Sequence, residues 1–315
     1  MWRDAGEPAG RTTASVRGKE RPGYAPAMRV IASVPASSAN LGPGFDALAL
    51  ALDLRNEVTC DTDVEPAVTV TGQGAGELPE DATNLIFRAM AFVAREVGGR
   101  LPPFRLDSAN QIPLERGLGS SAAAVVAGVT LADRLLEANL GADRILEMAV
   151  DIEGHPDNVA ACLRGGLVLA HLSEHGWRAE RLELHPGLAP VLLVPEHERL
   201  STDDARRVLP QKVSLTDAAF NAGRSALALL ALTERPDLLP EALEDRLHQR
   251  YRLPLVPGTR AAFERLRESR LAVCVSGAGP SILAFEGPGP AVPELGPGWR
   301  ILRPGVATEG ATISS

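Results

Sequence analysis

The amino-acid sequence predicts an α+β protein of two domains. Strand-like and helix-like segments alternate in both halves of the chain, which is typical of layered α and β structure. The 315 residues suffice for two domains that each bury a core. A stretch bounded by two prolines, residues 186–190, separates the halves. We therefore expect domains over residues 28–185 and 186–303, and a flexible tail over residues 304–315.

The first 27 residues are expected to lie outside the fold. They mix Arg, Gly, Pro and small polar residues without apolar periodicity. They also lack the apolar core of a secretory signal. A strand-like run begins directly after Met28, so we interpret residues 1–27 as a disordered extension or as a mis-assigned start of translation.

Periodicity places the elements of the first domain. Apolar alternation and short apolar runs predict strands at residues 29–34, 48–60, 67–72, 104–106 and 167–172. Helical spacing of apolar residues predicts helices at residues 84–97, 122–136 and 142–152. Residues 81–83 offer a cap for the first helix, and a Gly-Gly turn at Gly165 and Gly166 opens the last strand.

The second domain follows the same alternation. A strand is expected at residues 191–194. Helices are expected at residues 203–208, 215–232 and 259–269, and a hairpin at residues 272–285. The two halves show no repeat of one another, so neither domain is predicted as a copy of the other.

Composition excludes several classes of function. A net charge of -8 argues against a nucleic-acid partner held by phosphate contacts. No run reaches the roughly 20 apolar residues of a membrane span, so no membrane association is expected. Cys60, Cys162 and Cys274 lie far apart in the sequence and suggest neither a metal pair nor a disulfide framework. A reducing cytoplasmic location is therefore expected.

Lysine is nearly absent, which argues against phosphate-binding sites that depend on a lysine side chain. Of the 32 basic residues only Lys19 and Lys212 are lysines. The P-loop and the protein-kinase fold each need a specifically placed lysine. Neither fold is expected.

The strongest local signal is the Gly-rich segment PLERGLGSSAA at residues 113–123. Two glycines allow close backbone approach, and free amides at the start of the following helix form an anion site. The segment lacks the Gly-Lys-Ser/Thr of a Walker loop, and Ala122 stands where a dinucleotide fingerprint needs glycine. A tight turn before an Ala-rich core helix is the alternative. The predicted nucleotide-binding residues are Pro113, Leu114, Glu115, Arg116, Gly117, Leu118, Gly119, Ser120, Ser121, Ala122 and Ala123.

This segment resembles the ATP-binding motif of the GHMP small-molecule kinases. Four more segments follow the order of that superfamily. Three are similar to motifs of its homoserine kinases: VPASSANLGPGFDAL at residues 34–48, EGHPDNVA at 153–160 and LSTDDARRVLP at 200–210; SGAGPS at 276–281 is similar to the superfamily's carboxy-terminal Gly-rich turn. The resemblance spans about residues 28–285. Five motifs in order are much more specific than one.

The resemblance implies a GHMP kinase fold and its reaction. The first domain would carry a left-handed β-α-β phosphate-binding unit, and the second would be ferredoxin-like, with the active site between them. The implied reaction transfers phosphate from ATP to homoserine, giving O-phosphohomoserine for threonine biosynthesis. A homodimer is common in the family.

The resemblance also implies a magnesium ion. Magnesium keeps most of its waters and needs few protein oxygens. Ser121 and Glu147 are similar in position to the family's magnesium-associated pair. A solvated helix glutamate is the alternative for Glu147.

Four residues match family positions that hold the ends of the amino acid. Asn40 and Asp46 would meet its ammonium or hydroxyl group, although turn chemistry also explains them. Arg206 and Arg252 match the arginines that grip its carboxylate, which a planar guanidinium bonds in bidentate fashion. Arginine is so frequent here that a surface charge is the alternative for either.

Three further residues match positions near the reacting groups. Thr202 and Asn158 would lie close to the acceptor hydroxyl and the phosphates; a helix cap and a turn are the alternatives. His155 is the obvious candidate for a general base. The resemblance instead implies a substrate-proximal histidine and catalysis by positioning and charge stabilisation.

Two other functions stay open from the sequence. One is a GHMP kinase for another small alcohol, such as mevalonate or a sugar, and the arginine pair favours an amino acid over these. The other is a non-catalytic ligand sensor on the same fold. The presence of Gly117, Gly119, Ser121 and Glu147 favours an enzyme.

Overall fold

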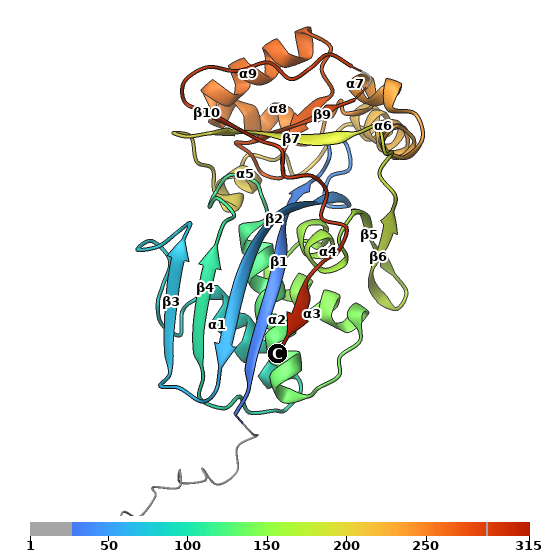
Figure 1. Cartoon of the computed structure of the whole chain (residues 1–315). Coiled ribbons are helices and arrows are strands. Elements are labelled where there is room, and N and C mark those ends of the chain that lie inside the picture. Colours follow the sequence, from blue (N-terminus) through green and yellow to red (C-terminus); the bar gives the residue numbers. More distant parts are fainter. Residues whose placement is uncertain (1–26, 288) are drawn as a thin grey trace, which may run out of the picture.

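The structure, a computed structural model, describes residues 27–287 and 289–315. Each of two domains is built on its own β-sheet, and the domains meet where the long strand β1 ends and β2 begins (Figure 1). This arrangement confirms the predicted two-domain α+β fold. Nearly all of the predicted N-terminal extension lies outside the described residues. None of the described helices is long and apolar enough to cross a membrane.

The sheet of the first domain has seven strands. In chain order they are β1 (Arg29–Ala39), β2 (Leu48–Asp61), β3 (Ala67–Gly72), β4 (Arg105–Asn110), β5 (Leu167–Ser173), β6 (Gly176–Leu182) and β11 (Thr312–Ser314). The spatial order is β11-β1-β2-β4-β3, with β5 and β6 continuing from β2. Strands β3 and β4 are parallel and joined by helix α1, whereas the other pairs are antiparallel.

Strand β1 continues beyond the predicted end at residue 34. Its register against β2 shifts between Pro35 and Ala36. Proline has no backbone N–H to donate, and a bulge accommodates that break in the ladder. Pairing then resumes at Ala36 and continues through Ser37 and Ser38, both of which are fully buried. The bulge therefore lets β1 reach the boundary between the domains.

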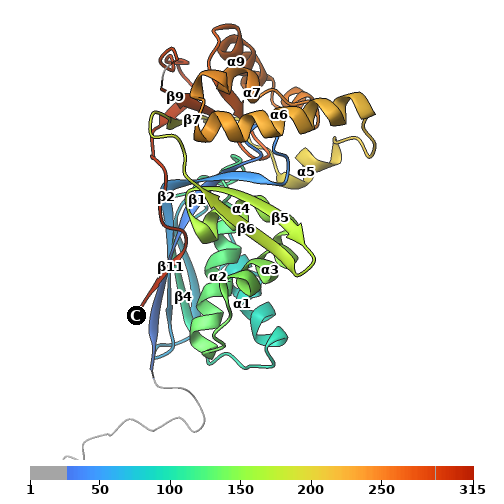
Figure 2. The ribbon, with the colours of Figure 1, turned by 90° about the vertical axis from the view of Figure 1, so that its right-hand side faces the viewer.

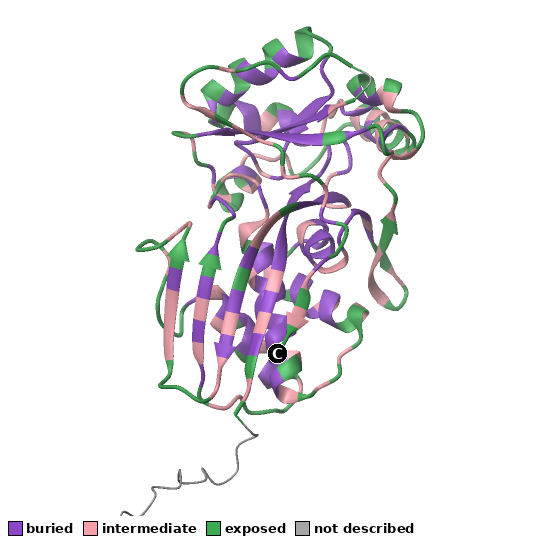
Figure 3. Cartoon of the chain, in the orientation of Figure 1, coloured by how far each residue is buried: buried purple, intermediate pink, exposed green. Residues whose placement is uncertain are grey.

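Helices cover one face of this sheet (Figure 2). They are α1 (Leu85–Glu96), α2 (Ser120–Leu136), α3 (Ala142–Glu153) and α4 (Pro156–Arg164). Helix α2 is buried along most of its length, at the centre of the core (Figure 3). The predicted cap of α1 at residues 81–83 is wrong, because Asn84 accepts the hydrogen bond from the Ile86 amide. Helix α4 was missed because Pro156 looks like a helix breaker, but proline fits the first helical position.

The sheet of the second domain has four strands. They are β7 (Ala189–Pro195), β8 (Val273–Val275), β9 (Ile282–Glu286) and β10 (Trp299–Leu302), all paired antiparallel. The order β10-β7-β9-β8 is that of a ferredoxin-like sheet. The helices are α5 (Thr202–Arg207), α6 (Leu215–Thr233), α7 (Leu239–Ala242), α8 (Gln249–Arg252) and α9 (Pro257–Glu268), with 3-10 turns at Pro236–Leu238 and Leu253–Leu255.

The end of the chain is not the flexible tail that we expected. Strand β11 pairs with β1, the outer strand of the first sheet, and Ala307 is buried. Arg55 donates to the carbonyls of Glu309 and Gly310, at 3.1 and 2.6 Å. This polar segment has too few apolar residues to show as a strand in the sequence. It is ordered because it covers the hydrogen-bonding edge of β1, which would otherwise stay open.

Candidate active site

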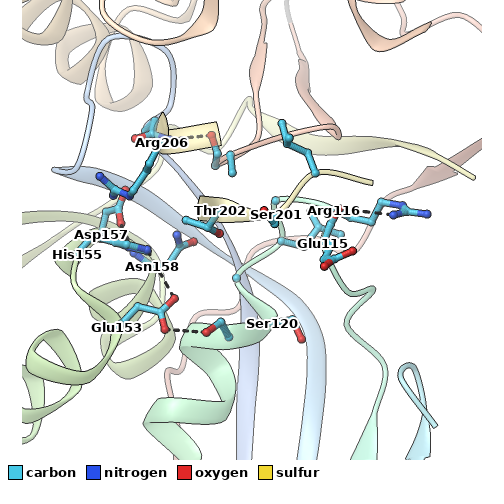
Figure 4. Close-up of a pocket in the computed structure, with 18 of the residues that line it drawn as sticks. Glu115, Arg116, Ser120, Glu153, His155, Asp157, Asn158, Ser201, Thr202 and Arg206 are labelled. Atoms are coloured by element: carbon cyan, nitrogen blue, oxygen red, sulfur yellow. Dashed lines mark hydrogen bonds and ion pairs between the residues drawn. The ribbon is translucent and has the colours of Figure 1, made fainter. Parts of the chain in front are cut away.

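A cavity of about 290 Å³ lies at the boundary of the two domains. Figure 4 shows Glu153, His155 and Asn158 on one side and Glu115 on the other, with Thr202 between them. Every residue predicted to touch the acceptor lines this cavity: Asn40, Asp46, His155, Asn158, Thr202, Arg206 and Arg252. Segments far apart in the sequence therefore meet at one place.

The Gly-rich loop forms one wall of the cavity. Its lining residues are Pro113, Glu115, Arg116, Gly117, Leu118, Gly119, Ser120 and Ser121. Leu114 lines a neighbouring cavity, and Ala122 and Ala123 are buried within α2. Gly119 precedes α2 in the left-handed conformation (φ 70°), and no side chain caps the helix. The first amides of a 17-residue helix thus face a polar cavity, as an anion site requires.

The glycines let this loop pack tightly against distant segments. A Cβ on Gly117 would lie 2.1 Å from the carbonyl oxygen of Ser276, and one on Gly119 would lie 2.1 Å from Ser37 Oγ. Ser276 Oγ donates to the Gly117 carbonyl at 2.7 Å. The Ser37 amide donates to the Leu118 carbonyl at 3.1 Å. The loop is therefore held between β1 and the turn that precedes β9.

The junction of α3 and α4 supplies a cluster of polar side chains. Helix α3 ends at Gly154 in the left-handed conformation, and His155 begins α4. Glu153 Oε2 accepts a hydrogen bond of 2.8 Å from Ser121 Oγ, at the start of α2. Asp157 Oδ1 lies 3.1 Å from His155 Nδ1, and Asn158 Oδ1 accepts from Ser37 Oγ at 2.8 Å.

Burial and mutual contact shift the pKa values of this cluster. Burial raises the pKa of Glu153, although the charge of His155 and the Ser121 hydrogen bond partly oppose the shift. Burial alone would lower the pKa of His155, but the hydrogen bond and charge of Asp157 and the charge of Glu153 outweigh it and raise that pKa. His155 Nε2 lies 3.6 Å from Glu153. With carboxylates at both ring nitrogens, His155 retains its proton more strongly than a free histidine.

The predicted pairing of Ser121 with Glu147 is wrong. Glu147 is absent from the cavity lining and forms ion pairs with Arg144 and Arg178, at 3.1 and 3.8 Å. Glu153 stands beside Ser121 instead. Glu153 is the first residue of the motif at residues 153–160 and lies six residues after Glu147 in α3. The missed signal was a carboxylate at the helix end, directly before the Gly-His-Pro turn.

The loop between β1 and β2 places Asn40 and Asp46. Both lie in the left-handed region, with φ of 69° and 55°, which Asn and Asp tolerate better than most residues. Asn40 Nδ2 donates to the Gly277 carbonyl at 2.9 Å, and Asn40 Oδ1 accepts from the Asp46 amide at 3.1 Å. Asn40 thus has the turn role that was its alternative, and it also lines the cavity.

The two predicted arginines are held differently. Arg206 forms a bidentate ion pair with Asp46, at 2.7 and 3.2 Å, and this contact raises the pKa of Arg206 against the opposing effect of burial. Arg252 is 2% exposed and donates to the Gly277 carbonyl at 2.9 Å. Burial, with the charge of Arg206, lowers the pKa of Arg252 to about 10. Their neighbours Arg207 and Arg250 pair with surface carboxylates outside the cavity.

Thr202 does not cap α5. Ser201 is the cap, because its Oγ accepts from the Asp204 amide at 3.1 Å. Thr202 is the first residue of the helix and lines the cavity. The capping alternative for Thr202 is therefore excluded, and its hydroxyl is available to the cavity.

A second cavity of about 400 Å³ adjoins the first. The two share Glu115, Ser120 and Ser121 of the Gly-rich loop. Its other walls are largely apolar and include Leu78 and Leu85. No sequence motif marked this cavity. A ligand lying over the loop can extend from one cavity into the other.

The sequence and the fold both resemble known proteins. Residues 84–166 match the model of the GHMP kinases N terminal domain. A homoserine kinase of Leifsonia xyli is 47% identical over 260 residues, which cover 81% of this chain and 80% of that protein. A homoserine kinase of Streptomyces coelicolor is 44% identical over 298 residues, covering 91% and 96%.

Solved structures agree with these relatives. The crystal structure of homoserine kinase from Cytophaga hutchinsonii superposes with a TM-score of 0.75 at 26% identity and covers 91% of this chain and 97% of that one. Mevalonate diphosphate decarboxylase from Staphylococcus aureus shares the fold at 13% identity, with a TM-score of 0.64. Relatives this similar over most of their length, together with a cavity lined by the motif residues, show that the chain belongs to the homoserine kinase family of the GHMP kinases.

Proposed function

We propose that this protein transfers the γ-phosphate of ATP to the hydroxyl of L-homoserine. One observation carries the proposal: an uncapped helix start and a pair of guanidinium groups face the same cavity. The helix start favours phosphate, and the guanidinium groups favour a carboxylate. The product is O-phospho-L-homoserine, an intermediate of threonine biosynthesis.

ATP fits the two adjoining cavities. Its phosphates bind over the Gly-rich loop, where the amides at the start of α2 meet them. Its adenosine part occupies the second, more apolar cavity, which shares Ser120 and Ser121 with the first. The support for this placement is the continuity of the two cavities across the loop.

The site also fits a magnesium ion. Ser121 Oγ and the Glu153 carboxylate are oxygen groups in contact at the start of α2, beside the phosphate position. Among the described residues no group of three or more His, Cys, Asp or Glu side chains is placed to hold a metal, and magnesium needs fewer. When bound, magnesium neutralises charge on the phosphates. Ser121 and Glu153, rather than Glu147, are the residues that we propose to hold it.

The charges of the cavity match an amino acid. Asp46 is paired with Arg206, whereas Arg252 donates to the main chain and to His248. The substrate carboxylate supplies the negative charge that Arg252 lacks, and its ammonium group meets Asp46. Mevalonate and sugars have no ammonium group for Asp46.

The mechanism depends on positioning and charge stabilisation, without a dedicated base. His155 has carboxylates at both ring nitrogens and a raised pKa, and both favour the protonated ring, which has no free nitrogen to act as a base. Asp46 is engaged by Arg206. Thr202 and Asn158, which both line the cavity, orient the hydroxyl and the phosphate. The hydroxyl proton leaves late, in a loose transition state, and passes to an oxygen of the transferred phosphate.

The remaining assignments follow from the same proposal. The three cysteines are free and buried, in keeping with a reducing cytoplasm.

A homodimer, which the family implies, is tested by light scattering of the purified protein.

A panel of acceptors tests the proposal. Homoserine, mevalonate and galactose are compared in an assay that couples ADP release to NADH oxidation. We expect turnover with homoserine to exceed the other two by at least about a hundredfold in kcat/KM. Mevalonate lacks an ammonium group for Asp46, and galactose lacks both that group and a carboxylate for Arg252. Equal turnover with mevalonate or galactose would assign another acceptor. ATP binding without turnover of any acceptor would favour a ligand sensor.

A further inference from the structure

A buried histidine outside the predicted site joins the substrate loop to Arg252. His248 is fully buried at the start of α8. Its Nε2 lies 2.8 Å from the carbonyl oxygen of Gly42, within the loop that carries Asn40 and Asp46. Its Nδ1 lies 3.3 Å from Arg252 Nη1. One ring nitrogen thus contacts the loop that carries Asn40 and Asp46, and the other contacts Arg252.

The contacts of His248 fix where its proton lies. A guanidinium only donates hydrogen bonds, so Nδ1, which faces Arg252, must be the acceptor. The proton of the neutral ring is then on Nε2 and is donated to the Gly42 carbonyl. Burial lowers the pKa of His248 against the opposing charge of Asp245, which favours this neutral form. Asp245 itself accepts from the amides of His248 and Gln249, at 2.8 and 2.7 Å.

Three acceptors together determine the orientation of Arg252. Nη1 donates to the Gly277 carbonyl at 2.9 Å and to His248, and Nε donates to the Ala205 carbonyl at 3.4 Å. Among the described residues, none accepts a hydrogen bond from Nη2. Because Arg252 lines the cavity, Nη2 is the edge of the guanidinium left for a ligand. His248 is the one side chain among these three acceptors.

We propose that His248 is a positioning residue, which aims Arg252 at the acceptor carboxylate and ties it to the substrate loop through Gly42. The proposal rests on the proposed function, since it assumes that Arg252 meets a carboxylate. It predicts that loss of the acceptor for Arg252 impairs the binding of homoserine and leaves the binding of ATP intact.

Two variants separate the contacts of His248. In His248→Asn the amide oxygen takes the place of Nδ1 and still accepts from Arg252, whereas contact with Gly42 is lost. In His248→Gln the amide nitrogen takes the place of Nε2 and still donates to Gly42, whereas the acceptor for Arg252 is lost. His185→Gln is the matched control, because His185 lies outside both cavities and contacts the Gly187 amide.

KM and kcat for homoserine and ATP are measured for all three variants. We expect His248→Gln to raise the KM of homoserine at least about tenfold, equivalent to about 1.4 kcal/mol, which is near the lower end for one hydrogen bond to a charged group. His248→Asn should stay within about threefold of the parent, and ATP KM should not change in any variant. An unchanged homoserine KM in His248→Gln, or equal losses for both substrates, would refute the positioning role.

A second measurement does not depend on enzyme activity. In nitrogen-15 NMR spectra of histidine-labelled protein at pH 7.5, the signal absent from His248→Asn identifies His248. We expect the neutral form with the proton on Nε2. A proton on Nδ1, or on both nitrogens, would overturn the proposal even if His248→Gln failed to fold. Failure of the parent enzyme to phosphorylate homoserine would instead refute the proposed function, which the NMR result does not test.

Discussion

The charged side chains of the cavity fall into two sets. Asp46 and Arg206 neutralise each other, as do His155 and Asp157. Glu153 and Arg252 are buried, and nearby opposite charges do not offset the effect of burial. Burial therefore raises the pKa of Glu153 and lowers the pKa of Arg252 to about 10. Groups held in such states gain most from a ligand of opposite charge. At the scale of single residues, the site is thus prepared for a cation beside Glu153 and an anion beside Arg252.

Replacing Glu153 by Gln should abolish most of the activity. The change replaces the proposed carboxylate ligand of magnesium by a neutral amide, which binds the cation more weakly, and a bound cation contributes several kcal/mol to phosphoryl transfer. We expect kcat/KM to fall at least about a hundredfold. The magnesium concentration for half-maximal rate should also rise as pH falls in the parent enzyme, because protons compete for a carboxylate whose pKa burial has raised. Both are measured by titrating magnesium in the coupled assay.

Glu147→Gln is the control for this prediction. Glu147 lies on the same helix, forms ion pairs with Arg144 and Arg178 and does not line the cavity, so its replacement should change kcat/KM by less than about twofold. A larger effect from Glu147 than from Glu153 would restore the assignment that the sequence favoured. Sequence spacing could not choose between these two glutamates, since both precede His155 on one helix and only the packing of α3 against α2 decides which one reaches Ser121.

At the scale of elements, the Gly-rich loop and helix α2 act as one unit. The loop was predicted from its sequence because turn chemistry is local: two left-handed glycines precede an Ala-rich helix. What the loop packs against was not predictable. Ser37 and Ser276 come from opposite ends of the chain, and they explain why a residue with a Cβ is excluded at Gly117 and Gly119.

Gly119→Ala should destabilise the protein. Alanine at φ 70° is strained, and its Cβ would collide with Ser37 Oγ. We expect a loss of about 1–3 kcal/mol in the free energy of unfolding, and weaker ATP binding. Gly223→Ala is the matched control within α6, where a Cβ meets no atom within 4 Å. It should stabilise the protein by about 0.5–1 kcal/mol. Urea unfolding measures both, and equal stability of the two variants would show that Gly119 is not required.

At the scale of the whole molecule, the two domains are joined by segments that return from one to the other. The Gly-rich loop of the first domain contacts the second, where Arg116 donates to the carbonyls of Pro195 and Glu196 at 3.0 Å. The chain then ends by adding β11 to the first sheet. The cavity is therefore enclosed by a chain that crosses the boundary more than once.

Deleting residues 304–315 should destabilise the protein. The deletion exposes the edge of β1 and removes two acceptors of Arg55, at 3.1 and 2.6 Å. We expect a loss of at least about 2 kcal/mol, which lowers Tm by roughly 4–8 °C. Differential scanning calorimetry measures the shift. Arg55→Ala should reproduce part of it, whereas an unchanged Tm after the deletion would restore the flexible tail.

The sequence by itself determined the class of fold, most helices and strands, the Gly-rich loop and the family to which the chain belongs. These features depend on neighbouring residues: apolar periodicity, turn glycines and short motifs. Only the tertiary structure decided that Glu153 rather than Glu147 meets Ser121, that β11 closes the first sheet, and that His248 holds Arg252. Each of these contacts joins segments whose separation in space is set by the packing of the whole chain, and no local pattern encodes it.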